Sequence, residues 1–141
     1  MRVETRARAR ALQALYAWDM RGEQSRGEQA ADRVAEQIWD DLAVTADERA
    51  LARVLVRTVA HEHEAIDTAL ADVTVNWRLE RLGAIERSIL RLAAAELLRG
   101  EVPPRVVIQE AVRLGERYGS EQSARFVNGV LDALARRMGR L

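Results

Sequence analysis

Arginine recurs at one-turn spacing along the beginning of the chain. Arg2, Arg6 and Arg10 are four residues apart, Arg8 lies between them, and Glu4 is the only acidic residue among the first ten. A guanidinium group can hold a phosphate through two parallel hydrogen bonds. The whole chain has no net charge, with 22 arginines against 22 acidic residues. A nucleic-acid site must therefore come from local clustering of this kind rather than from bulk electrostatics.

A helix over residues 3–20 is needed to place these arginines on one face. Its apolar side chains then form a stripe within about 100° of arc, made of Ala7, Ala11, Ala14, Leu15 and Trp18. The opposite side carries Arg2, Arg6, Arg10, Gln13 and Tyr16. An amide can bond to a base edge and a tyrosine ring can stack on a base, so this face is predicted to bind single-stranded RNA. The alternative is a solvated face, or one covered by acidic residues of another helix.

Groups suited to catalysis or metal binding are nearly absent from the sequence. It contains no cysteine, which excludes disulfides, thiolate metal sites and a cysteine nucleophile. His61 and His63 are two residues apart, so on a helix they point to different sides and do not share a metal. No glycine-rich phosphate loop is present. We therefore expect no enzymatic activity, no cofactor and no metal.

The apolar pattern predicts an all-α fold of about six or seven helices. Apolar residues recur with a period of 3.6, and strand-like alternation is nearly absent. Thr45 followed by Glu48 is a capping box, in which each side chain satisfies the other residue's backbone N–H. The expected helices cover residues 3–20, 28–42, 45–60 or 45–72, 84–99, 104–118 and 120–138. The length suits one domain, and the lack of a membrane-spanning apolar run predicts a cytoplasmic protein without a membrane partner.

Two acidic residues and two glycines in the second half have more than one interpretation. Glu80 and Glu86 flank apolar faces near a helix start, where either the helix dipole or a basic protein partner accounts for them. Gly115 lies inside a buried stripe, which predicts close approach of another helix. Gly129 lies in the middle of a helix, where glycine costs about 1 kcal/mol relative to alanine. The expected reason is a neighbouring helix packed on it, the alternative being RNA or a partner that contacts Phe126.

The sequence resembles the NusB family in four stretches that follow one another in the family's order. They are ARARALQALYAWD at 7–19, NWRLERLGAIERSILRLAAAELL at 76–98, VPPRVVIQEAV at 102–112 and GSEQSARFVNGVLDALARR at 119–137. FVNGVLD at 126–132 is the most specific of these elements. Together they span nearly the whole chain.

This resemblance implies a single RNA-binding domain over residues 1–141 with two small helical parts, about 1–75 and about 76–141. It also implies a role in processive antitermination, notably of ribosomal RNA operons. The implied partners are single-stranded boxA-like RNA, small ribosomal subunit protein ten (NusE) and the RNA polymerase antitermination complex. Whether the free protein is a monomer or a homodimer stays open.

The resemblance also assigns candidate site residues. Those implied for RNA are Arg6, Arg8, Arg10, Gln13, Tyr16 and Phe126. Those implied for the protein partner are Tyr16, Glu80 and Glu86, so Tyr16 has two possible roles. The sequence departs from the common family pattern at Ala9, Ala95, Gln109 and Glu116. The last of these exchanges a positive for a negative charge and weakens an RNA path along its helix.

Three other functions compete with RNA binding. A similar helical domain precedes certain ribosomal RNA cytosine methyltransferases, but their catalytic domain needs a cysteine and a cofactor-binding sheet. A pure protein-interaction module predicts partner binding that survives loss of the arginines near the N-terminus. A DNA-reading helix-turn-helix is disfavoured, because no helix combines a short turn with a basic recognition face.

Overall fold

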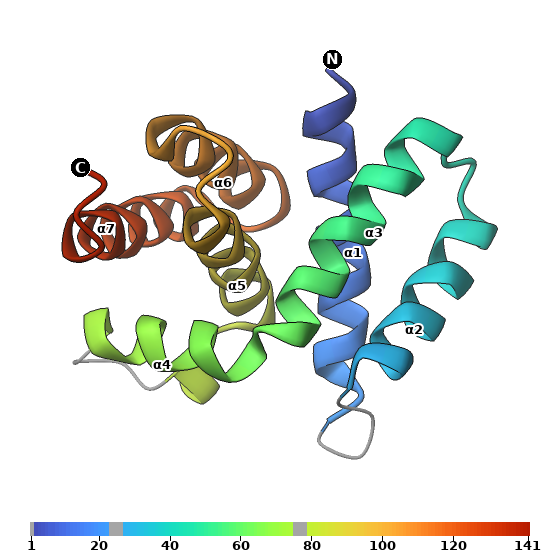
Figure 1. The fold of residues 1–141 in the computed structure, drawn as a ribbon, viewed down its shortest axis with the longest axis horizontal. Helices are drawn as coiled ribbons and strands as arrows, with labels where there is room; N and C mark the ends of the chain where they lie inside the picture. Colours follow the sequence, from blue (N-terminus) through green and yellow to red (C-terminus); the bar gives the residue numbers. More distant parts are fainter. Residues whose placement is uncertain (1, 23–26, 75–78) are drawn as a thin grey trace. The chain divides into compact units, whose positions relative to one another are not determined.

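The computed structural model describes residues 2–22, 27–74 and 79–141, except for the side chain of Glu80. Most of the linker-like stretch at residues 22–27 lies outside these residues, as does Asn76-Trp77, where the sequence opens a short segment before the helix expected at 84–99. Within them the chain forms seven α-helices, one short 3-10 helix and no strand, which confirms the predicted all-α class (Figure 1). The elements are α1 (Val3–Met20), α2 (Glu28–Asp41), α3 (Ala46–His61), α4 (His63–Val73), the 3-10 helix η2 (Leu79–Arg81), α5 (Ala84–Arg99), α6 (Pro104–Tyr118) and α7 (Glu121–Arg137).

The chain divides into two compact units, Met1–Glu62 and His63–Leu141. The division falls where Glu62 interrupts the helical path between α3 and α4, whereas the family resemblance implied a boundary near residue 75. The helix expected from residue 45 therefore ends at His61 and does not continue to 72. No helix in the described ranges is both long and apolar enough to cross a membrane.

The first unit is a three-helix arrangement in which α1 packs against α2 and α3, and α2 packs against α3. The predicted apolar stripe of α1 is buried at all five positions. Trp39 of α2 is fully buried, and its indole Nε1–H donates to the backbone carbonyl of Arg10 at 3.2 Å. This bond and the apolar contacts fix which side of α1 faces outward.

In the second unit α5 is the central helix, because α4, α6 and α7 all contact it. Residues 88–97 are consequently buried without interruption, and they include the carboxylate residue Glu96. Glu96 has a polar partner, as a buried carboxylate requires. Ser120 caps α7 by accepting from the backbone N–H of Ser123 at 3.1 Å. Gly100 ends α5 in the left-handed conformation, with φ of 71°, a conformation that glycine adopts without a steric cost.

The two helical glycines of the second unit have opposite surroundings. A Cβ at Gly115 of α6 would lie 3.0 Å from the Cα of Ala124 and 3.2 Å from its backbone nitrogen, so α6 and α7 approach closely there, as predicted. A Cβ at Gly129 of α7 would meet nothing within 4 Å. The expected neighbouring helix on Gly129 is therefore wrong, because that side of α7 is exposed.

We expect alanine at these two glycines to change stability with opposite signs. Gly129→Ala should raise the free energy of unfolding by about 1 kcal/mol, because it only improves helix propensity. Gly115→Ala should lower it by about 1–2 kcal/mol, since backbone atoms of α7 must move to admit the methyl group. Urea unfolding of both variants measures the difference. Two changes of the same sign would contradict the packing of α6 on α7.

Candidate nucleic-acid interface

The outward side of α1 carries a row of polar side chains, as the sequence predicted. Tyr16 is exposed, at 37% of its surface, although it is aromatic. Arg6, Arg10 and Gln13 are half-buried. Arg10 donates from Nη1 to Oε1 of Gln13 at 3.3 Å, which couples the amide to the arginine. From Arg6 to Tyr16 the row extends about 15 Å along the helix axis.

Arg8 does not belong to this row. It is buried, with 7% of its surface exposed, and it has a polar partner within the chain. A phosphate can reach a guanidinium group only through an open side. We therefore leave Arg8 out of the RNA-contact set that the resemblance implied for it.

Arg6 and Arg10 share one buried carboxylate, which belongs to Glu48 of α3. Arg6 donates from Nε to Oε1 of Glu48 at 2.5 Å. The Nε of Arg10 lies 3.5 Å from Oε2, an ion-pair distance at which that oxygen lacks hydrogen-bond geometry. Glu48 is only 4% exposed, while the side chains of Arg6 and Arg10 are 39% and 27% exposed. The alternative of an acidic residue from another helix is thus partly correct, because Glu48 lies at both arginines.

Glu48 reaches α1 because it lies in the first turn of α3. Thr45 caps that helix, and its Oγ1 accepts from the backbone N–H of Glu48 at 3.3 Å. The carboxylate turns to Arg6 and Arg10, so one half of the predicted capping box is confirmed and the carboxylate of Glu48 has a different role. Sequence reasoning recognised Glu48 but missed this role. The available signal was the excess of arginine over residues 2–10 together with the acidic first turn of a later helix, at Asp47 and Glu48.

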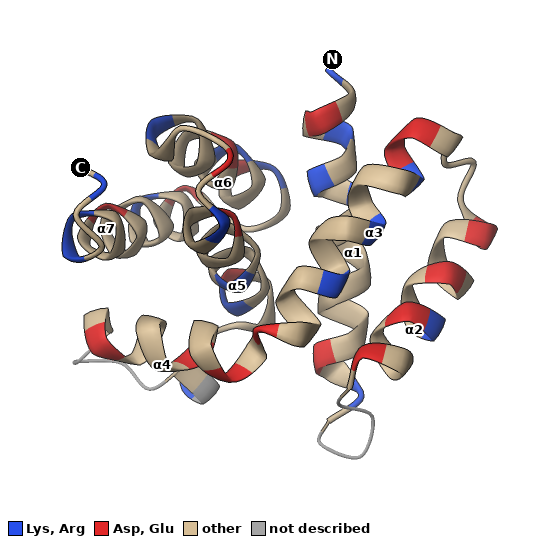
Figure 2. Cartoon of the chain, viewed as in Figure 1, with Lys and Arg blue, Asp and Glu red and all other residues tan. Residues whose placement is uncertain are grey.

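Several other acidic residues of the first unit bridge α2 and α3, and Figure 2 shows acidic bands along α2. Glu36 bonds to Arg49 at 2.5 Å and to Arg53 at 2.7 Å. Burial raises the pKa of Glu36, but the hydrogen bonds from Arg49 and then Arg53 outweigh it and hold that pKa below its usual value. The hydrogen bond to Glu28 raises the pKa of His61. These carboxylates pair with arginines and a histidine of α3, whereas Arg6 and Arg10 of α1 meet Glu48.

The candidate residues of the second unit are separate features. Glu86 is half-buried in the first turn of α5, and its Oε1 accepts from Ser123 Oγ at 2.6 Å. This bond and the helix dipole support the simpler interpretation of Glu86, without removing it from the surface. Phe126 is half-buried on α7 and takes part in a further interaction. The side chain of Glu80 lies outside the described residues.

The chemistry of the α1 face is recognition by charge, hydrogen bonding and stacking. Within the described parts of the chain no group of three or more His, Asp or Glu residues is placed to hold a metal. Two half-exposed guanidinium groups, an amide and an exposed tyrosine follow one another on a rigid helix. Fold and face together define an all-helical protein of two compact units, with a cationic and aromatic helix face suited to a polyanion.

Comparison with known proteins identifies the family to which this all-helical chain belongs. The family model described as "NusB family" matches residues 5–136. The transcription antitermination protein NusB of Anaeromyxobacter dehalogenans (strain 2CP-1 / ATCC BAA-258) is 48% identical over 132 residues, which are 93% of this chain and 89% of that protein. The protein of the same name from Sorangium cellulosum is 42% identical and covers 100% of this chain and 97% of its own length. The chain belongs to the NusB family.

Solved structures agree with this assignment. A crystal structure of the antitermination factors NusB and NusE in complex with double-stranded RNA matches with a TM-score of 0.85 and 32% identity, covering 97% of this chain and 98% of that one. The solution structure of NusB from Aquifex aeolicus matches with a TM-score of 0.81 and 33% identity, covering 96% and 89%.

Proposed function

We propose that this protein is a transcription antitermination factor that binds boxA-type single-stranded RNA together with small ribosomal subunit protein ten (NusE). Together they help to assemble a modified RNA polymerase complex that reads through terminators, notably on ribosomal RNA operons. The role is one of positioning, without covalent chemistry. The names of the relatives and the NusB–NusE–RNA composition of the similar crystal structure support it.

The observation that carries the RNA part of the proposal is the row on α1. Arg6 and Arg10 present guanidinium groups that stay partly exposed while both lie at the carboxylate of Glu48. Gln13 supplies an amide beside Arg10, and Tyr16 an exposed ring. Phosphates fit the arginines, and a splayed base fits the ring and the amide. Phe126 is proposed as a further RNA contact from the family resemblance.

The partner protein is assigned to Tyr16, Glu80 and Glu86, also from the resemblance. Carboxylates at the surface suit a basic ribosomal protein, since complementary charge steers association and fixes partner choice. Glu86 is half-buried and accepts a hydrogen bond from Ser123. Its expected contribution is therefore to the partner contact and to the start of α5 at the same time.

We expect removal of the α1 charge cluster to weaken RNA binding without unfolding the protein. The variant is Arg6→Met/Arg10→Met/Glu48→Leu, which keeps the bulk of the side chains and leaves no buried carboxylate behind. Two lost phosphate contacts should lower affinity for boxA-like RNA about 10-fold or more, at roughly tenfold for each 1.4 kcal/mol. The slope of log affinity against log salt should become less steep by about 1.4, at about 0.7 per phosphate for a single strand.

Gel-shift binding to a boxA-like RNA and to a scrambled RNA, with and without the ribosomal partner, measures this effect. The control Arg33→Met/Arg117→Met removes two exposed arginines outside the row and should bind as wild type does.

Tyr16→Ala separates the two roles of that ring. If the ring contacts RNA, its loss weakens RNA binding even without the partner protein. Unchanged affinity of the triple variant would defeat the site, and equal binding to both RNAs in all conditions would defeat the specific function.

A further inference from the structure

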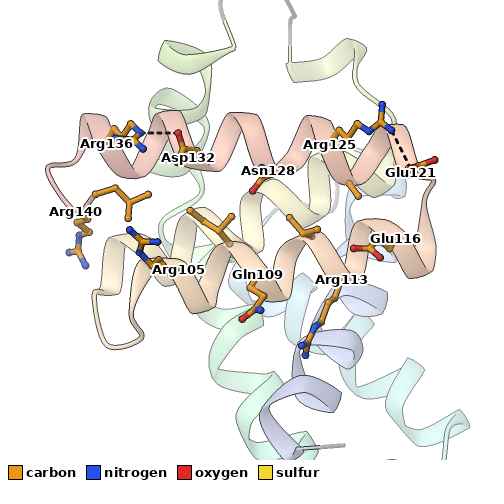
Figure 3. Close-up of a pocket in the computed structure, with 14 residues that line it drawn as sticks. Arg105, Gln109, Arg113, Glu116, Glu121, Arg125, Asn128, Asp132, Arg136 and Arg140 are labelled. Carbon is orange, nitrogen blue, oxygen red and sulfur yellow. Dashed lines mark hydrogen bonds and ion pairs between the residues drawn. The ribbon is translucent and has the colours of Figure 1, made fainter.

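A polar groove runs between α6 and α7 of the second unit, on a surface that the proposed RNA and partner contacts do not use. The two helices are joined by only Gly119 and Ser120, and side chains from both line the groove (Figure 3). The groove has a volume of about 1320 Å³. Five arginines and three carboxylates line it, so the lining has a net charge of +2 in a protein with none overall.

The positive charge is concentrated at one end of the groove. Arg105, Arg136 and Arg140 gather there with only Asp132, as Figure 3 shows. Asp132 pairs with Arg136 at 2.9 Å. The guanidinium groups of Arg105 and Arg140 form no ion pair or hydrogen bond with other described residues. We call these three arginines the arginine end.

At the opposite end the charges balance, because Arg113 and Arg125 face Glu116 and Glu121 (Figure 3). Arg125 pairs with Glu121 at 3.2 Å, and both side chains are exposed. Such an exposed pair contributes at most about 1 kcal/mol. A stronger anion can therefore displace Glu121 from Arg125, so this pair does not close the groove to a ligand.

Between the two ends lie two amides, Gln109 of α6 and Asn128 of α7 (Figure 3). Both side chains are exposed and make no hydrogen bond to other described residues. Asparagine weakens a helix interior because its amide competes with the backbone for hydrogen bonds. Asn128 belongs to the FVNGVLD element and forms no hydrogen bond with other described residues in return. Two exposed amides in mid-groove are suited to a ligand that offers both donors and acceptors.

We propose that the groove between α6 and α7 is a second RNA contact, which holds the phosphates of a single strand at the arginine end and its base edges at Gln109 and Asn128. The inference rests on the proposed RNA-binding function and extends it to the second unit. Guanidinium groups match phosphate geometry, and amides hydrogen-bond to base edges. Glu116, whose negative charge opposes phosphate, lines the balanced end, so the phosphates are assigned to the arginine end.

An acidic peptide is the other polyanion that such a surface could attract, and the lining favours RNA over it. Peptide helices seat apolar anchors in hydrophobic grooves. Here the apolar lining consists only of Ile108, Val112, Ala124 and Leu141, among ten charged or amide residues.

The test compares RNA of two lengths, the boxA-like element alone and the same element with single-stranded flanks of about ten nucleotides, which is within the range of single-strand site sizes. Arg105→Met/Arg140→Met removes the two unpaired guanidinium groups and breaks no bond within the described residues. We expect wild type to bind the flanked RNA more tightly than the short one. The variant should bind the short RNA as wild type does and lose most of the gain, about 10-fold, with a salt slope smaller by about 1.4.

Each outcome decides for or against the groove. Loss of the gain in this variant but not in Arg33→Met/Arg117→Met supports it. A gain that persists, or no gain in wild type, overturns it while the boxA site on α1 stands. If wild type shows no boxA preference, the proposed function fails, and equal binding of wild type and variant to a plain single strand then overturns the groove as well. Loss of polyglutamate binding with unchanged RNA binding would assign the groove to an acidic peptide and overturn the RNA contact.

Discussion

Replacing Arg6 and Arg10 together with methionine is expected to destabilise the first unit by about 3–5 kcal/mol, because the change leaves a buried charge without a partner. Glu48 is almost completely buried, and both arginines that face its carboxylate would be gone. The methionine side chains keep the unbranched stems, so packing changes little. The loss is therefore assigned to the carboxylate and not to a cavity.

Adding Glu48→Leu to this variant should restore most of the lost stability, since a buried ion pair replaced by apolar groups is often neutral or stabilising. Thermal unfolding measures the difference. For a chain of this size about 1 kcal/mol corresponds to roughly 2–4 °C, so the double variant should melt about 10 °C or more below the triple variant. Arg33→Met/Arg117→Met should stay within a few degrees of wild type. Equal melting of the double and triple variants would show that Glu48 does not depend on these arginines.

This expectation also determines how the RNA site must be tested. Removing the arginines alone lowers both affinity and stability, so weak binding of that variant has two explanations. The arginine face has a structural as well as a proposed functional role, because Arg6 and Arg10 compensate the buried carboxylate of Glu48. Only the triple variant separates the two.

Removing Asp67 is expected to have the second large effect, a loss of about 3 kcal/mol in the free energy of unfolding of the second unit. Arg91 of α5 is buried, and its Nε and Nη2 donate to the two oxygens of Asp67 on α4 at 2.9 and 3.0 Å. His63 lies 3.3 Å from the same carboxylate. In Asp67→Ala the buried guanidinium loses its bidentate partner.

A matched control lies on the same helix. Asp72 of α4 is exposed and lies 4.0 Å from the exposed Arg137, so Asp72→Ala should change stability by no more than about 0.5 kcal/mol. Combining Asp67→Ala with Arg91→Met should recover much of the loss, because no buried charge remains. Urea unfolding followed by circular dichroism compares the four proteins. If Asp67→Ala is as mild as Asp72→Ala, the bidentate pair does not hold α4 on α5.

The positions of the helices followed from the sequence because helix formation depends on near neighbours. The apolar residues of α1 recur at spacings of three and four, and its predicted bounds of 3–20 coincide with Val3–Met20. Pro104 at the start of α6 and Gly100 after α5 mark helix ends by backbone constraints of single residues. The same local signals were too weak to show the break at Glu62, where no proline or glycine stands.

The polar face of α1 was also predictable, since a helical wheel separates it from the apolar stripe without knowledge of any neighbour. Its exposed Tyr16 and its Arg10–Gln13 pair are consequences of spacing along one helix. The burial of Arg8 was not predictable, because Arg8 lies between the two faces and only the packing of the folded chain decides which side encloses it. Gly129 was misread for a related reason, since a mid-helix glycine has the same sequence signature whether its neighbour is a helix or open space.

The sequence alone determined the helices, their apolar faces and the family resemblance, all of which depend on residues close together in the chain or on their order. Tertiary structure decided which charges meet. Arg6 and Glu48 are 42 residues apart, and no local pattern specifies that the first turn of α3 comes to lie against α1. Ion pairs form between residues that are close in space and not necessarily in sequence. The net charge of a helix face is therefore known only once the neighbouring helices are in place.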